Sequence, residues 1–475
     1  MFGNTVTIIG GGLSGCSLAA QLSDQAEKPL KINIIEPRSV LGAGVAYSAD
    51  DIDHRLNAPL FVHFLTPDRA EEFQNWFVDS GGLNRDPDAL AADGNIYARR
   101  TEFADYVSEK MADYLQANPS NSAITHLQEK AVDILPITNG YRIVTESGSN
   151  IESDAVVLAT GNRSPAAPSP FDKELEDHPA FIVSPWDLEK IRNIDENTNV
   201  LIIGAGLTMS DVVATLSRQG HNGTITAVSR NGQIPKTHAP PPEDATPRHP
   251  FDGVMEDKPP HLDGSLLEVF VNLRKRMKED MAADGYWHWA FDELRDCVWQ
   301  IWPHFSEREK RQYLRYLRPW YDSHRFRLPP QTAHILDDAL ERNILTYKTG
   351  HVVSALDRGK QIEVRLNIHP DSQFEDHRFD AIINCTGPVL SPAKTKNPIY
   401  QSILRRDLVK ETAINIGFDV DAHCRAISKY GVPQKNLFIV GSPTVGVFGD
   451  PIGAPFIIAQ IWRMAPTLLQ TLSSK

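Results

Sequence analysis

The chain has 475 residues, of which 41% are hydrophobic and 23% are charged, and its formal net charge is −13. This length is enough for two or three domains, each with a core of its own. The acidic balance argues against nonspecific nucleic-acid binding, which needs a basic surface.

Cysteine spacing and apolar runs indicate the compartment. The chain has four cysteines, and none of them forms a C-x-x-C pair. The spacing predicts neither a disulfide framework nor a bound metal, and it fits a reducing environment. No apolar run approaches the length of about 18 residues that spans a bilayer, and no secretory signal precedes the first predicted strand. We therefore expect a cytoplasmic protein without a membrane span.

The first predicted element is a buried strand, "TVTIIG", which leads through a glycine turn into a helix. Gly10, Gly12 and Gly15 form G-x-G-x-x-G, which permits a tight turn, a close approach to a pyrophosphate, and close packing of helix on strand. The next strand, "INIIEP", ends in Glu36, whose carboxylate can accept hydrogen bonds from ribose hydroxyls. The pattern predicts a dinucleotide site.

A helical insertion is predicted at about residues 48–125, from the stretches "TPDRAEEFQNWF" and "RRTEFADYVSEKMADYL". An apparent strand meander, "YRIVTESGSNIES", follows the insertion. It leads into "DAVVLATGN" (154–162), in which an Asp precedes a buried strand that ends in Thr-Gly.

The same plan is repeated in the second half of the chain. "NVLIIGAGLTMSDVVATL" carries Gly204 and Gly206, with Met209 in place of the third glycine. A second apparent meander, "IEVRLNIHPDSQFEDHRF", leads into "DAIINCTGP" (380–388), which again ends a buried strand in Thr-Gly. Such an internal duplication indicates two related modules.

The two modules differ in the charge that ends their second strand. Arg230, in "ITAVSR", follows Gly204 at the spacing at which Glu36 follows Gly10. A carboxylate suits a free ribose 2′-hydroxyl and repels a 2′-phosphate, whereas Arg230 and the Ser229 hydroxyl can clamp that phosphate. Taken alone, Arg230 could be a solvated strand-end charge. With the matched spacing, we predict FAD at the first module and NADPH at the second.

A Trp-rich helical insertion is predicted at about residues 240–330. It opens with "HAPPPEDATPRHP", either a mobile lid or a surface loop, because prolines forbid a regular helix there. Capping boxes at Ser265/Glu268 and Ser306/Glu309 predict two helix starts. Tryptophans could line a substrate cavity or fill a small helical core; they are Trp287, Trp289, Trp299, Trp302 and Trp320.

Next to these tryptophans, "WYDSHRFR" gathers Asp322, His324, Arg325 and Arg327. The cluster could steer a substrate carboxylate or the nicotinamide, or it could be a structural knot of salt bridges. The C-terminal "FIIAQIWRMAPTLLQTL" is expected to pack against the first module, with a membrane-facing surface as the alternative. The predicted boundaries are 1–170 plus 389–475 for the FAD-binding domain and 185–388 for the NADPH-binding domain.

The two-dinucleotide plan resembles the class B flavoprotein monooxygenases, which include N-hydroxylating, Baeyer–Villiger and flavin-containing enzymes. More specific stretches resemble the YdhS-type FAD/NAD(P)-binding proteins and are spread over almost the whole chain: "LGAGVAYSADDIDHRLNAP", "ITAVSRNGQIPKTH", "RYLRPWYDSHRFRLPP", "INCTGP" and "GVFGDPIGAPFIIAQ". The resemblance implies an α/β fold with two Rossmann-type dinucleotide-binding domains, β-meanders and a helical insertion.

Carried over residue by residue, the resemblance implies two sets of cofactor contacts. FAD would meet Gly10, Gly12, Ser14, Gly15, Glu36, Asn57 and Gly161, and NADPH would meet Gly204, Gly206, Ser229 and Arg230. Many related flavoproteins end in a "GD" whose Asp binds the ribityl chain. Here "LFIVGSP" has Ser442 at that place, and Asp450 in "VFGDPIG" is a candidate to replace it.

The function implied by the resemblance is that of a monooxygenase. NADPH would reduce the flavin, O2 would add to it as a C4a-peroxyflavin, and a small-molecule nucleophile would be oxygenated. Two alternatives remain: an NADPH:acceptor dehydrogenase that reduces a quinone or an electron carrier, and a non-catalytic FAD/NADPH redox sensor. Weak candidates for catalytic residues are His238, His324, Arg325 and Asp450. Substrate identity and oligomeric state are left open.

Overall fold

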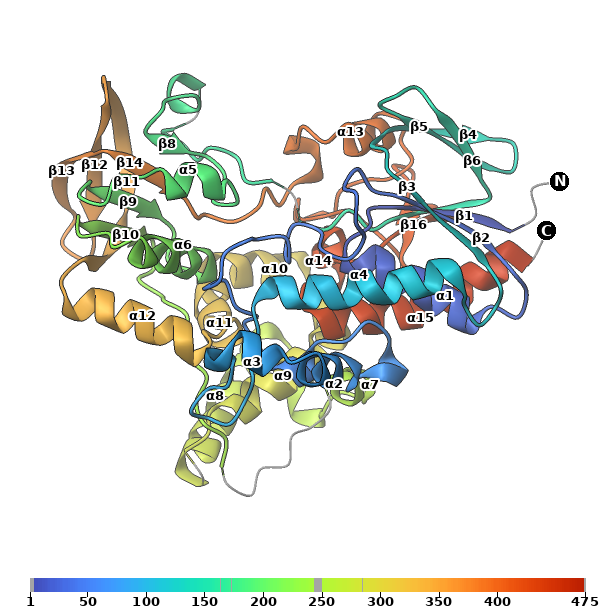
Figure 1. The fold of residues 1–475 in the computed structure, drawn as a ribbon, viewed down its shortest axis with the longest axis horizontal. Helices are drawn as coiled ribbons and strands as arrows, with labels where there is room; N and C mark the ends of the chain where they lie inside the picture. The colour runs from blue at the N-terminus through green and yellow to red at the C-terminus, as the bar shows by residue number, and fades with distance from the viewer. Residues whose placement is uncertain (1–3, 163, 172, 243–249, 284, 474–475) are drawn as a thin grey trace.

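The computed structural model describes residues 4–162, 164–171, 173–242, 250–283 and 285–473. In this part of the chain the strands form three sheets (Figure 1). The first sheet has the strand order β15 (Arg425–Ile427), β16 (Pro433–Ile439), β7 (Ala155–Leu158), β1 (Thr5–Ile9), β2 (Lys31–Ile35) and β3 (Ala123–Leu127). Its strands pair in parallel, apart from β15, which runs antiparallel to β16.

The second sheet repeats the central order of the first. Its strands, in spatial order, are β13 (Gln373–Phe379), β12 (Gln361–Ile368), β11 (Leu345–Arg358), β10 (Ile225–Ser229), β9 (Val200–Ile203), β14 (Ala381–Asn384) and β8 (Phe181–Ile182). β8, β14, β9, β10 and the start of β11 pair in parallel, and β11, β12 and β13 form an antiparallel meander. β14–β9–β10 therefore corresponds to β7–β1–β2, which confirms the predicted duplication.

A third, antiparallel sheet precedes β7. It consists of β4 (Ala131–Ile137), β5 (Gly140–Thr145) and β6 (Asn150–Ser153). In the second module, β12 and β13 precede β14 in the same way. Both predicted meanders are therefore present, and the α/β class with two Rossmann-type modules is confirmed.

Helices follow both glycine turns and fill both insertions. α1 (Leu13–Gln25) and α6 (Leu207–Arg218) follow the turns. The first insertion contains α2 (Glu72–Asp79), α3 (Gly82–Arg85) and α4 (Arg100–Gln116). The remaining helices outside the Trp-rich insertion are α5 (Leu188–Arg192), α12 (Pro330–Glu341), α13 (Pro398–Arg405), α14 (Val445–Phe448) and α15 (Ala454–Ser473).

Most of the Trp-rich insertion lies below the two sheets in Figure 1. It contains α7 (Pro250–Met255), α8 (Leu266–Ala283), α9 (His288–Ile301), α10 (Glu307–Gln312), a π-helical turn (Tyr313–Leu317) and α11 (Arg318–Arg325). Both capping boxes form: Ser265 and Glu268 exchange hydrogen bonds before α8, and Ser306 and Glu309 do so at α10. The predicted lid or loop falls largely on residues 243–249, outside the described residues.

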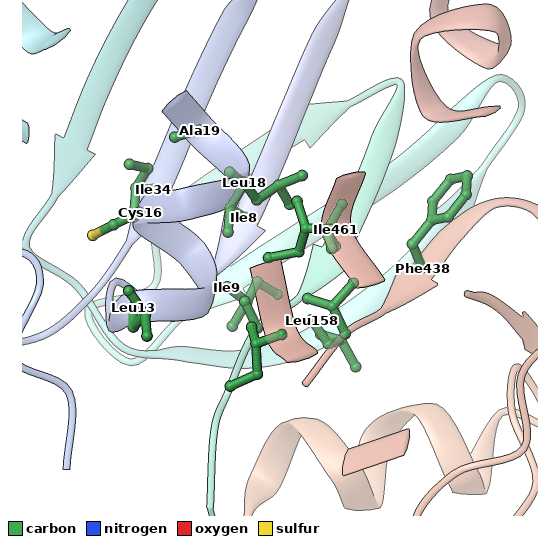
Figure 2. Packing of buried hydrophobic residues seen from close by; sticks show 14 of the residues in the cluster. Ile8, Ile9, Leu13, Cys16, Leu18, Ala19, Ile34, Leu158, Phe438 and Ile461 are labelled. Atoms are coloured by element: carbon green, nitrogen blue, oxygen red, sulfur yellow. The ribbon is translucent and has the colours of Figure 1, made fainter. Parts of the chain in front are cut away.

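In the largest hydrophobic core, the first sheet packs against α1 and α15 (Figure 2). Ile8 of β1, Leu18 of α1 and Ile461 of α15 are fully buried. The β-branched run of β1 is buried on both faces, as expected of a central parallel strand. The C-terminal helix therefore packs against the first module, as predicted. Among the described residues, no helix is both long and apolar enough to cross a membrane.

Candidate functional site

The first glycine turn holds α1 against β1. Gly10 has φ +110°, and a Cβ built on it would lie 2.4 Å from the carbonyl oxygen of Ala159. A Cβ on Gly15 would lie 1.9 Å from the carbonyl oxygen of Gly10. Gly12 is the N-cap of α1; it provides no side-chain cap, and the first turn has no acidic residue. The backbone N–H groups at this helix start therefore suit an anion such as a pyrophosphate.

The second glycine turn repeats this geometry. Gly204 has φ +108°, and its Cβ would lie 2.4 Å from the carbonyl oxygen of Cys385. Gly204 N donates to Val228 O at 2.8 Å, just as Gly10 N donates to Ile35 O at 2.9 Å. Gly206 caps α6 without a side-chain hydrogen bond, and a Cβ on it would meet nothing within 4 Å. The second turn thus offers an uncapped helix start with open space in front of it.

Met209 occupies the position of the third glycine and is fully buried in the core of the second module. Its backbone N donates to Gly206 O at 2.9 Å, a tight first turn of α6. Methionine in place of the third glycine therefore affects the packing of α6 on the sheet, and the turn that would face a phosphate is kept.

Glu36 is buried at the end of β2, and its carboxylate binds the glycine turn. Oε2 accepts a hydrogen bond from Gly11 N at 2.9 Å, and Oε1 accepts from the backbone N and Nη1 of Arg38, both at 3.1 Å. The ribose contact predicted from the sequence stays a prediction. The structure adds that Glu36 fixes the turn, which the sequence pattern did not reveal.

Arg230 directly follows β10, at the place that Glu36 holds after β2. Its side chain is exposed, and no described residue forms a hydrogen bond or ion pair with it. Ser229, the last residue of β10, is half-buried. The contrast with the anchored Glu36 leaves the Arg230 guanidinium able to bind an anionic group.

A cavity of about 930 Å³ lies where the two modules and the Trp-rich insertion meet. The first module contributes Asn57 and Asn162, which follows the positive-φ Gly161. Leu207 and Thr208, the first residues of α6, come from the second module. Phe456, near the start of α15, completes the wall. The cavity thus adjoins the end of β7 and the helix after the second glycine turn.

Polar atoms near the start of α1 support a place for a cofactor. Gly441 has φ +76°, and a Cβ on it would lie 3.1 Å from Ser14 Oγ. The neighbouring Ser442 Oγ is buried and has no hydrogen-bond partner among the described residues. A buried hydroxyl without a partner costs free energy unless a ligand or water satisfies it. Together with the uncapped helix start, these atoms fit a dinucleotide that passes this point.

The four weak catalytic candidates separate into two groups. His238 and Arg325 line the cavity. His324 instead lies in the core of the insertion, stacked on Phe291 with ring centroids 4.7 Å apart. Asp450 is buried and accepts a hydrogen bond from Arg325 Nε at 2.9 Å.

The structure divides the tryptophans between core and cavity and shows ion pairs in the charged cluster, whereas the steering role of that cluster stays a prediction. Trp302 is buried in the core of the insertion, whereas Trp289 lines the cavity. Arg327 pairs with Asp292 at 2.8 Å and its guanidinium lies over the ring of Trp287. Arg327 and Asp292 also line the cavity. This ion pair therefore holds the insertion together and also forms part of the cavity wall.

A network of ion pairs and hydrogen bonds, which we call the clamp, joins the modules. Arg100 of the first insertion binds both carboxylate oxygens of Asp211 on α6, at 2.8 and 2.9 Å. Asp51 accepts hydrogen bonds from Thr215 and Arg218, each at 2.9 Å. Sequence reasoning missed these residues. Asp211 could have been singled out by its position, one turn into the helix that follows the second glycine turn. No sequence pattern pointed to Asp51 or Arg100.

Comparisons with known proteins agree with this geometry. Residues 7–163 match a family model described as FAD-NAD(P)-binding. No curated protein matches the chain. Among solved structures, L-lysine 6-monooxygenase from Pseudomonas syringae has a TM-score of 0.66 and 15% identity, with 99% of each chain covered.

Two further structures are similar over their whole length. One is the ornithine N-hydroxylase of Kutzneria sp. 744 with reduced FAD, NADP+ and L-ornithine; its TM-score is 0.64 at 14% identity, covering 100% of this chain and 99% of that one. The other is the FAD-bound cadaverine monooxygenase of Erwinia amylovora, with a TM-score of 0.63 at 13% identity, covering 100% and 95%. The chain therefore has the two-module fold of the FAD- and NADPH-dependent N-hydroxylating monooxygenases.

Proposed function

We propose that the protein is an FAD-dependent, NADPH-using monooxygenase that acts on a small molecule in the cytoplasm, and that it is a YdhS-type FAD/NAD(P)-binding protein. The observation that carries the proposal is the pair of glycine turns, one followed by an acidic and the other by a basic residue, in two modules that both line one cavity of about 930 Å³. Fold similarity to three flavin monooxygenases over 99–100% of the chain supports it.

The proposed division of labour follows the two modules. Residues 1–170 and 389–475 would bind FAD, and residues 185–388 would bind NADPH. The FAD contacts are Gly10, Gly12, Ser14, Gly15, Glu36, Asn57 and Gly161, and the NADPH contacts are Gly204, Gly206, Ser229 and Arg230.

When bound, the flavin supplies hydride acceptance and reaction with O2. The overall reaction consumes NADPH, a proton, O2 and substrate, and it yields NADP+, water and the substrate with one added oxygen atom. The chain's own residues place the reactants and exclude water. Phe456 and Trp289 supply apolar surface to the cavity, and Arg325 lines it with its charge paired to the buried Asp450.

Stopped-flow spectroscopy of the full-length, FAD-loaded protein tests this function. We expect NADPH to reduce the flavin without oxygen, and oxygenated buffer then to produce a transient spectrum that matches neither reduced nor oxidised flavin. Direct return to the oxidised spectrum would instead favour an NADPH:acceptor dehydrogenase. NADPH binding without flavin reduction would favour a redox sensor.

Arg230→Ala should weaken NADPH binding by about 1–3 kcal/mol, because a charge-assisted contact to the 2′-phosphate is lost. NADH affinity and FAD content should be unchanged. Titration calorimetry with both nicotinamide cofactors measures the difference. Arg308→Ala, at an exposed position of α10, is the matched control and should alter neither affinity. Equal losses for NADPH and NADH would contradict the 2′-phosphate assignment.

A further inference from the structure

Five aromatic rings from three segments line one wall of the cavity, and we call them the ring wall: Tyr97, His238, Tyr286, His288 and Trp289. Consecutive ring centroids lie 5.4 Å apart for Tyr97 and His238, and 5.7 Å for His238 and His288. The centroid of Tyr286 lies 4.3 Å from that of His288 and 4.8 Å from that of Trp289. Tyr97 and His288 are themselves buried, so the ring surface open to a ligand comes from His238, Tyr286 and Trp289. That surface matches a flat aromatic ligand, because offset and edge-to-face ring pairs are favourable.

Most carboxylate oxygens of the same cavity are already engaged, and Asp280 Oδ2 is the exception, buried without a hydrogen-bond partner among the described residues. Among the described lining residues, every carboxylate lies within ion-pair distance of an arginine or histidine: Asp211 with Arg100, Asp280 with Arg276, Asp292 with Arg327 and Arg295, Asp296 with Arg295, and Glu293 with His261. An ammonium group buried here would need a carboxylate of its own. It would have to share a carboxylate with the arginine or histidine that already binds it.

The two histidines of the ring wall carry no charge at neutral pH. Burial, reinforced by the charge of Arg327, lowers the pKa of His238 to about 4 and that of His288 to about 2. His288 Nε2 accepts a hydrogen bond from Ala239 N at 3.2 Å, so its proton is on Nδ1, which lies 2.7 Å from the Tyr286 hydroxyl. The hydrogen-bonding capacity of His288 is therefore used by Ala239 N and the Tyr286 hydroxyl.

His238 is placed differently. Its Nε2 lies 3.0 Å from the carbonyl oxygen of Asn57, a contact that requires the proton on Nε2. Its Nδ1 then carries a lone pair, and no described residue donates to it. A ligand seated on the ring wall can satisfy this acceptor with an N–H or O–H group.

We propose that the substrate is a planar aromatic molecule, uncharged where it meets the ring wall, with an N–H or O–H donor for His238; phenols and N–H heteroaromatics such as indoles have this chemistry. The inference rests on the proposed monooxygenase function and names its substrate class. It differs from the ornithine, lysine and cadaverine named for the structures of similar fold.

Isothermal titration calorimetry of the full-length, FAD-loaded, oxidised protein tests the substrate class. The probes are indole, phenol, tryptamine, L-lysine and cadaverine, and tryptamine is the cationic match of indole. We expect indole or phenol to bind at least about tenfold more tightly than the three amines. A smaller difference, a preference for the amines, or no binding of either aromatic overturns the proposal. Binding is measured without NADPH turnover, so the result does not depend on whether the protein is a monooxygenase.

Ring-wall variants locate the binding. Tyr286→Leu and Trp289→Leu should each weaken the aromatic probe by about threefold to tenfold, the effect of losing one ring contact, with FAD content retained. The control is Tyr316→Leu, because Tyr316 is 65% exposed in the π-helical turn and is not a lining residue of the cavity. Unchanged affinity in both ring-wall variants, or an equal loss in the control, overturns the assignment of this wall.

Discussion

Replacing Gly15 with alanine is expected to remove FAD from the protein and to lower the free energy of unfolding by about 3 kcal/mol. The new Cβ would lie 1.9 Å from the carbonyl oxygen of Gly10 and 3.3 Å from Ile8 Cγ2. The closer contact is with backbone, so no change of rotamer relieves it. Alanine also gains about 1 kcal/mol of helix propensity over glycine, which is too little to offset the clash. α1 must therefore move away from β1 and carry its N–H groups with it.

Flavin absorbance of the purified protein and its thermal unfolding measure the two effects. Gly206→Ala is the matched control in the second module. Its φ is −91°, and the added Cβ meets nothing within 4 Å. We expect that control to keep FAD, to lose about 1 kcal/mol of stability at most as an altered N-cap, and to bind NADPH more weakly. A Gly15→Ala protein with full flavin content and an unchanged unfolding midpoint would refute the crowding argument.

The duplication could be predicted because its signals are local. β1 and β9 are short runs rich in β-branched residues, and Gly10 and Gly204 both need positive φ. The meanders and the capping boxes also depend on residues close in sequence. Local chemistry of this kind repeats wherever its sequence repeats, so the order of the central strands followed from the two copies.

The cavity could not be predicted from such signals. Tyr97 and His288 line the same cavity, yet they belong to insertions of different modules. Neither position stands at a periodic or capping site, and tertiary packing alone brings them together. For the same reason the sequence could not predict which tryptophans lie in the core and which line the cavity, and the structure shows some in each place.

Arg100→Ala is expected to lower the free energy of unfolding by about 3–5 kcal/mol and to slow flavin reduction by NADPH. Arg100 and Asp211 are both nearly buried, with side chains 13% and 11% exposed, and they pair through two contacts. Removing the arginine leaves the Asp211 carboxylate buried without its partner, and this is the costly way to break such a pair. Arg100 Nε also donates to Arg55 O at 3.0 Å, so the segment that carries Asn57 loses a support.

A double-mutant cycle separates the ion pair from mere loss of packing. Arg100→Ala combined with Asp211→Ala removes both charges, and we expect it to be more stable than Arg100→Ala alone. Arg192→Ala is the control, at an exposed arginine next to the clamp. That side chain is 41% exposed and 3.8 Å from Asp51, so its loss should cost less than about 1 kcal/mol. Urea unfolding gives the energies, and anaerobic stopped-flow gives the rate of flavin reduction.

The two readouts of this cycle have different meanings. Stability recovered in the double variant shows that an uncompensated buried charge caused the loss. The double variant has no uncompensated carboxylate, but the link between Arg100 and α6 is still missing. If flavin reduction stays slow in that variant, the pair therefore also sets how the NADPH module is oriented toward the FAD module. Additive losses in stability would show instead that the two side chains act independently, and the clamp would then be no more than two packed residues at a domain boundary.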